Sequence, residues 1–292
     1  MDTQFTLGAT AEVLAALRQI TDKPVSTLIN THWHDDHTFG NQIYRQAFPG
    51  LRILAHANTQ QDLATVGVEN RKQQVEGGPE TLALFRDAVA TGRSLDGTPM
   101  SPEERAAYRN TIDIVVQYLE DVPHFELTPP TETFADRLTL QQGSRVIELR
   151  HFGPSVTRGD AVVCLPKERV LIAGDVVDEP VPFAYGCHVA GWLSTLKQLR
   201  ALSPRIIVPG HGPVMHDAAQ IDRLAGVLAS IQKQAAAGVE RGETLEALRP
   251  KLDLEEARLV MAGSDKMLGF IFRTYFAWPA LANAYEEARG KP

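Results

Sequence analysis

The chain has 292 residues, of which 43% are hydrophobic and 22% charged, so it resembles an ordinary globular protein and can bury a sizeable core. Its formal net charge of -7 and pI near 5.7 leave no basic surface for a phosphate backbone, so no nucleic-acid partner is expected. There is no run of about 18 apolar residues, and the start MDTQFTLGAT lacks the features of a signal peptide. We therefore expect no membrane span. The cellular location stays open, because a longer parent chain with an export signal is compatible with this sequence.

Short elements are predicted in the first 60 residues. Apolar residues recur at helical spacing over 9–20, and VSTLIN at 25–30 is a β-rich run that ends at THWHDDHTFGN. After a short helix ending near residue 50, LRILAH at 51–56 is a second predicted strand. The histidine-rich stretch is therefore expected at the C-terminal end of a strand.

A helical insertion is predicted from about 58 to 125. This segment is rich in Ala, Glu, Gln, Leu and Arg, and GGP at 77–79 and DGTP at 96–99 are expected to break it. Ser101-Pro102-Glu103-Glu104 forms a capping box with proline at the first helical position, which predicts a helix over 102–120. We expect the insertion to lie over or beside the functional site.

The chain becomes β-rich from residue 131. Four runs separated by turn signals, TFADRLTLQ, SRVIELRHF, DAVVCL and RVLIAGD, predict a largely antiparallel sheet. A helix at 190–202, the strand RIIVPG at 205–210 and C-terminal helices over about 217–292 follow. Phe270, Phe272, Tyr275, Phe276 and Trp278 make an apolar face, expected in the core or in a homodimer interface.

The stretch THWHDDHTFGN predicts a metal site. Alternate residues of an extended chain face one side, so His32 and His34 can converge, and the following turn brings Asp36 and His37 alongside. Imidazole and carboxylate ligands without cysteine suit a catalytic zinc site, with room for one or two ions. A solvated polar loop is the alternative, but so dense a histidine pattern rarely arises by chance.

The motif order resembles that of the metallo-β-lactamase superfamily. T-H-x-H-x-D-H followed by Gly-Asn matches the family signature, Asp175 in VLIAGDVV matches its next aspartate, and His211 in IIVPGHGP matches its last histidine. The family's early Asp-Thr pair matches Asp2-Thr3. The resemblance implies a single α/β domain over 1–292, an αββα sandwich with the helical insertion.

The resemblance also implies a ligand set and a reaction. One zinc would take His32, His34 and a third histidine; the other would take Asp36, His37 and His211, and Asp175 would bridge both. A metal-bound hydroxide would then attack an ester, lactone, thioester or amide of a small-molecule substrate, with Asp36 and Asp175 as the catalytic carboxylates. An aspartate at 175 resembles general hydrolases more than true β-lactamases, which usually have Cys or Ser there, and leaves weak β-lactam cleavage open.

Two departures from the family pattern weaken this set. GPSVTRGD at 153–160 places Val156, which has no lone pair, where the family's third histidine belongs, so the second zinc site is favoured. His151 lies five residues earlier, where strand alternation points it to the opposite face. The chain also starts one residue before the Asp-Thr pair, without the strands that usually precede it. We therefore expect a chain that is trimmed, mis-started or completed by a partner.

The sequence leaves other roles open. The rival hypothesis is a non-catalytic or nearly inactive family member that serves binding or regulation, whereas an oxidoreductase branch would need a flavin domain or a di-iron ligand set. His188 in YGCHVAGW and Trp33 are candidate substrate contacts, with an exposed loop residue and a core aromatic as the alternatives. His56, His124 and His216 are expected to be structural or surface residues, and Cys164 in AVVCL is expected to be a buried thiol.

Overall fold

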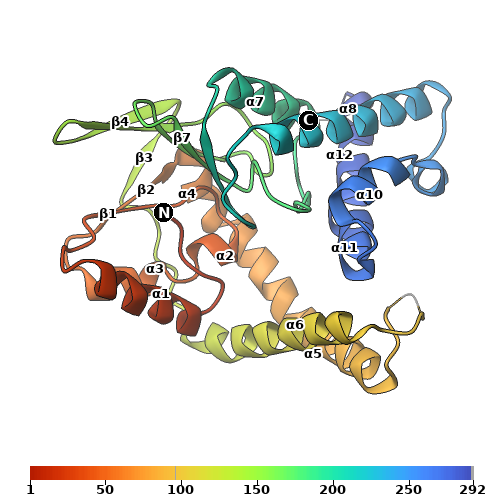
Figure 1. Cartoon of the computed structure of the whole chain (residues 1–292), viewed down its shortest axis with the longest axis horizontal. Helices are drawn as coiled ribbons and strands as arrows, with labels where there is room; N and C mark the ends of the chain where they lie inside the picture. Colours follow the sequence, from red (N-terminus) through yellow and green to blue (C-terminus); the bar gives the residue numbers. More distant parts are fainter. Residues whose placement is uncertain (96, 291–292) are drawn as a thin grey trace. The chain divides into compact units, whose positions relative to one another are not determined.

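The structure is a computed structural model that describes residues 1–95 and 97–290. The chain divides into two compact units, Met1–Thr133 (unit 1) and Phe134–Pro292 (unit 2), and each combines a sheet with helices (Figure 1). The mixed α/β class is therefore confirmed. A single domain over 1–292 stays a prediction, and Asp96 of the DGTP signal lies outside the described residues.

Unit 1 contains a small sheet with the strand order β1-β2-β3. Its strands are β1 (Thr27–Ile29), β2 (Arg52–His56) and β3 (Glu132–Phe134). β1 and β2 are parallel, and the β2 side chains of Ile53 and Leu54 are fully buried. The predicted run TFADRLTLQ is thus wrong as one strand, because its first residues pair in this sheet and its later residues in another.

Four helices precede or follow β1 and β2 along the sequence: α1 (Leu7–Ile20), α2 (Asp35–Thr38), α3 (Asn41–Ala47) and α4 (Ala57–Leu63). α1 begins where the Thr6 hydroxyl accepts a hydrogen bond from the Ala9 amide, a typical N-cap. Its Leu14 joins Leu28, Tyr44 and Ile53 in the apolar cluster of unit 1. Tertiary packing therefore fixes both sides of the segment that carries the histidines.

The insertion consists of α5 (Val66–Thr91) and α6 (Pro102–Asp121), which lie side by side (Figure 1). The prediction that GGP at 77–79 breaks the helix is wrong, because α5 runs through it. A Cβ on Gly78 would lie 2.9 Å from Leu119 of α6, so the glycine permits close helix packing. The packing outweighs the cost of Pro79 inside the helix.

The capping box at the start of α6 is confirmed. The Ser101 hydroxyl accepts from the Glu104 amide, and the Glu104 carboxylate accepts from the Ser101 amide. Tyr108 is buried against Phe85 of α5, with ring centroids 5.2 Å apart. Local capping and this apolar contact together stabilise the helix pair.

Unit 2 contains a five-stranded sheet of order β4-β5-β6-β7-β8. The strands are β4 (Arg137–Gln142), β5 (Arg145–Arg150), β6 (Val162–Leu165), β7 (Val170–Gly174) and β8 (Ile206–Pro209). Neighbouring strands from β4 to β7 are antiparallel, as predicted, whereas β7 and β8 are parallel. Because parallel strands end at the same sheet edge, residues after β7 and β8 lie next to each other.

Helices cover an extensive apolar core in unit 2. They are α7 (Val189–Ala201), α8 (Ala219–Glu240), α9 (Leu245–Leu248), α10 (Glu255–Ala262), α11 (Lys266–Ile271), the π-helical η3 (Phe272–Ala277) and α12 (Trp278–Ala288). Phe272 and Phe276 are core residues, whereas Trp278 is partly exposed. Burial raises the pKa of Cys164 to about 11 and of Cys187 to about 12, so both buried thiols stay protonated.

A membrane-spanning segment would need a long, strongly apolar helix. Within residues 1–95 and 97–290, no helix meets both requirements.

Candidate metal centre

The histidine-rich loop follows β1, as predicted, and continues into the short helix α2. Buried polar groups fix its backbone: the carbonyl of His37 accepts from the Thr3 amide at 2.9 Å and from the Asn30 side chain at 3.1 Å. The Thr3 hydroxyl in turn accepts from the Gly40 amide at 3.0 Å. The N-terminal residues and the loop therefore form one hydrogen-bonded structure.

Three imidazoles gather on this loop. The ring centroid of His32 lies 4.4 Å from that of His34 and 4.2 Å from that of His37. His32 and His37 are buried, and His34 is partly exposed. Unit 1 thus brings together the three predicted histidine ligands of the motif.

Asp2 fixes the tautomers of two of these histidines. Its carboxylate accepts from Nδ1 of His37 at 3.1 Å and from the Thr31 hydroxyl at 2.9 Å. Since that hydroxyl donates to Asp2, it accepts from Nδ1 of His32, 2.9 Å away. In the neutral rings, both Nε2 atoms then carry a lone pair, as a metal ligand requires.

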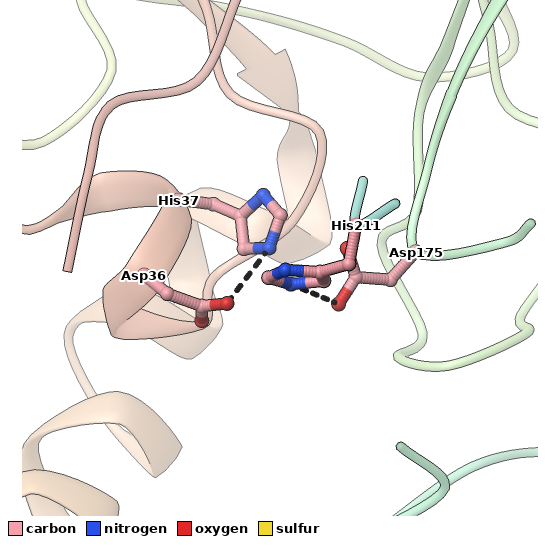
Figure 2. A group of neighbouring side chains, drawn as sticks. All are labelled: Asp36, His37, Asp175 and His211. Carbon is pink, nitrogen blue, oxygen red and sulfur yellow. Dashed lines mark ion pairs between the residues drawn. The ribbon is translucent and has the colours of Figure 1, made fainter. Parts of the chain in front are cut away.

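Asp36 completes the donor set of unit 1. Its Oδ2 lies 3.1 Å from Nε2 of His37, the pair marked by a dashed line in Figure 2. A protonated ring forms an ion pair with this carboxylate, whereas a neutral ring directs a nitrogen lone pair and an oxygen lone pair toward one point. Imidazole nitrogens and carboxylate oxygens of this kind can hold a metal ion.

Within unit 2, Asp175 follows β7 and His211 follows β8. Oδ2 of Asp175 and Nε2 of His211 are 3.7 Å apart (Figure 2). Asp175 is only 4% exposed, and Gly210 lies so close to it that a Cβ there would collide with Oδ1 of Asp175. The glycine before His211 is thus required by the close approach of the two segments.

The backbone of His211 is held from both sides by a segment that the sequence did not indicate. Its amide donates to Oδ1 of Asp178 at 2.9 Å, and its carbonyl accepts from the Glu179 amide at 3.1 Å. Asp178 is 1% exposed. The residues after Asp175 therefore position His211, and only the closeness of Asp178 to Asp175 could have drawn attention to it.

Replacing Asp178 with alanine should loosen His211. The hydrogen bond from the His211 amide to the Asp178 carboxylate is lost, so we expect the free energy of unfolding to fall by about 1–3 kcal/mol. Urea denaturation of the metal-free protein measures this loss. Asp178→Asn keeps an acceptor oxygen and should cost less; an equal loss for both variants would show that this hydrogen bond is not what Asp178 contributes.

Val156 lies in the loop where the family's third histidine was expected. Asp160 fixes this loop, because its carboxylate accepts from the Ser155 amide at 3.1 Å and the Thr157 amide at 2.8 Å. Burial raises the pKa of Asp160 to about 7 although these donors lower it. The Val156 side chain, 1% exposed, belongs to the apolar core of unit 2.

The other candidate residues have structural contacts. Nδ1 of His151 donates to the carbonyl of Asp160 at 2.8 Å, and His188 precedes α7, with its amide donating to the Ser155 carbonyl. Trp33 is buried against His34 and close to Gly67. His56 caps α4 through the Asn58 amide. Substrate contacts of His188 and Trp33 stay predictions.

A family model and a curated relative match the chain. The family model of the Metallo-beta-lactamase superfamily matches residues 2–211. A curated relative, "Linear primary-alkylsulfatase" of Pseudomonas sp. (strain ATCC 19151), is 25% identical over 269 residues, which are 87% of this chain and 47% of that protein. The chain thus spans about half the length of this relative.

Solved structures also resemble the chain. A metallo-beta-lactamase from Pontibacter korlensis matches with a TM-score of 0.51, 19% identity and coverage of 78% of this chain and 80% of that chain. The DIM-1 metallo-beta-lactamase matches with a TM-score of 0.51, 18% identity and coverage of 78% of each chain. At such identities these matches show the fold alone. The family match over residues 2–211 shows that the chain belongs to the metallo-beta-lactamase superfamily.

Proposed function

We propose that the chain is a zinc-dependent hydrolase. The observation that carries the proposal is the pair of buried histidines, His32 and His37, whose Nδ1 atoms are held by Asp2 directly or through Thr31. Such outer contacts orient metal-binding imidazoles and raise their basicity. A solvated polar loop would not need this buried arrangement.

The ligands follow the motif order of the family. His32 and His34 would hold one zinc; Asp36, His37 and His211 would hold another, and Asp175 would serve both. When bound, zinc lowers the pKa of water toward neutrality and polarises a carbonyl or related group. Asp36, with 31% of its side chain exposed, reaches solvent and can accept a proton from water.

The proposed substrates are small molecules with an ester, lactone, thioester or amide bond. The relationship to a protein named as an alkylsulfatase adds a primary alkyl sulfate ester to this set. The aspartate at 175 supports a general hydrolase more than a β-lactamase.

The second candidate function is binding or regulation by a nearly inactive family member. Val156 favours it, because an apolar core residue takes the position of the third histidine. The first metal would then have His32, His34 and the shared Asp175, one histidine fewer than the family pattern provides.

Metal content and turnover test the proposal together. The protein is treated with chelator, reconstituted with zinc, analysed for zinc per chain, and assayed on an aryl ester, a lactone, a thioester, an amide and an alkyl sulfate. We expect at least one zinc per chain and zinc-dependent turnover of one bond class. Zinc binding without turnover would favour the binding function. A protein that binds no zinc and turns over none of these substrates would refute the proposal.

A further inference from the structure

Asp35 lies in the histidine-rich loop between two predicted ligands, yet its side chain contacts the helical insertion. Its carboxylate accepts from Arg71 of α5, with Nε 3.0 Å from Oδ2 and Nη2 2.5 Å from Oδ1. Oδ2 also accepts from the Tyr118 hydroxyl of α6 at 2.8 Å. One carboxylate thus joins both insertion helices to the loop.

Aromatic rings enclose this contact. The Arg71 guanidinium lies over the Phe125 ring, 3.8 Å from its centroid, and Tyr118 stacks on Phe5 at 4.3 Å. Phe39, at the end of the loop helix α2, packs against Phe125 at 4.6 Å. The Asp35 and Arg71 side chains are 3% and 10% exposed, so the ion pair is shielded from solvent.

Stability alone does not account for such an ion pair. Removing two charges from water costs several kcal/mol, and well-packed apolar residues in place of a buried ion pair often give a protein the same stability or more. A bidentate arginine, in contrast, fixes the orientation of a carboxylate in the plane of the guanidinium, which an apolar contact cannot do. The network therefore defines the geometry of the loop at residue 35.

That geometry matters at the neighbouring positions. His34 and Asp36 flank Asp35 and are the proposed ligands of different metals, so the residue between them influences both. The backbone from His34 to Thr38 is a single helical turn, where the His34 carbonyl accepts from the His37 amide at 3.1 Å. A rotation at Asp35 would thus turn both ligands.

We propose that Arg71 and Tyr118 are positioning residues, which hold His34 and Asp36 in ligand orientation through Asp35. The insertion then serves as the support of the metal-binding loop, besides any role in covering the site. The proposal rests on the proposed function for its metal, but the orientation of the histidines can be observed without one.

The test uses two variants and a matched control in the full chain. Tyr118→Phe removes one hydroxyl and keeps the ring stacked on Phe5; Arg71→Met keeps the apolar stem and removes the charge. Tyr108→Phe removes another buried hydroxyl of α6, which contacts the Leu95 amide rather than the loop. Chelator competition gives the zinc affinity, NMR gives the ring signals of the metal-free histidines, and thermal unfolding gives the stability.

We expect Arg71→Met to weaken zinc binding about 10- to 100-fold, the usual range for residues that orient metal ligands. Tyr118→Phe should show a smaller loss, and both should shift the signals of His34 and His37, whereas Tyr108→Phe should bind zinc like the wild type. Arg71→Met also leaves Asp35 buried without its cation. The double variant Asp35→Asn/Arg71→Met should therefore recover thermal stability without recovering zinc affinity.

Two results would overturn the positioning role. One is a loss of stability in Arg71→Met and Tyr118→Phe with unchanged zinc affinity, which would make the network structural only. The other concerns a wild type that binds no zinc, a result that by itself refutes only the proposed function. In that case, identical histidine signals in the metal-free wild type, Tyr118→Phe and Tyr108→Phe would refute the positioning role as well. Shifted signals in Tyr118→Phe alone would support it even in that case.

Discussion

Asp175→Asn is expected to abolish zinc-dependent turnover, with a loss of about 10³-fold or more. Metal ions contribute several kcal/mol to transition-state stabilisation, and each 1.36 kcal/mol is a factor of ten in rate. In the proposed ligand set Asp175 serves both metals, and a neutral amide is a poorer ligand than a carboxylate. Steady-state assays and zinc analysis of the purified variant measure the two losses.

The same substitution should leave the metal-free protein at least as stable as the wild type. Asp175 is buried after β7, and a neutral amide of the same shape costs less to bury than a carboxylate. Zinc should raise the Tm of the wild type, because a ligand that binds only the folded state stabilises it, and should not raise the Tm of the variant. The Asp175→Asn variant thereby distinguishes an effect on zinc binding from an effect on the stability of the metal-free protein.

Asp222→Asn is the control, since Asp222 of α8 is exposed and pairs with Arg200 of α7. It should bind zinc and turn over substrate like the wild type. A variant at position 175 that retains zinc and activity would exclude Asp175 from the ligand set.

Local signals predicted the secondary structure well where they acted alone. The capping box fixed the start of α6, and the apolar spacing fixed α1, because both depend on residues within one or two turns. GGP misled the prediction in α5, since the propensity of Gly and Pro was outweighed by the contact between Gly78 and Leu119, 41 positions apart. Such a contact cannot be read from the window around the glycines.

The candidate site divides in the same manner. The density of histidine in THWHDDHTFGN indicated a metal site, and the matching motif order indicated the family, which the family match confirmed. The supporting residues carry no such pattern. Arg71 lies among the polar residues of a long helix, and its partner Asp35 is one of two adjacent aspartates. Nothing in the sequence marks these two residues as a pair, and only the structure shows their contact.

Position 156 is where the sequence and the proposed function conflict, and Val156→His should resolve the conflict. The new imidazole supplies the lone pair that the family pattern has at this position, so we expect the zinc content to approach two per chain and activity to rise about tenfold or more. Asp160 holds the backbone of the loop through the Ser155 and Thr157 amides, which do not depend on the side chain at 156. The loop should therefore keep its conformation.

The substitution should also cost stability in the metal-free protein. Val156 is 1% exposed within the core of unit 2, so a larger ring with polar nitrogens should destabilise the fold by about 1–3 kcal/mol. Zinc should recover this loss in Val156→His but not in Val156→Leu, which adds volume without a ligand. Zinc content and Tm, each measured with and without zinc, distinguish the variants. If Val156→His binds no more zinc than Val156→Leu, the missing histidine is not what limits the first site.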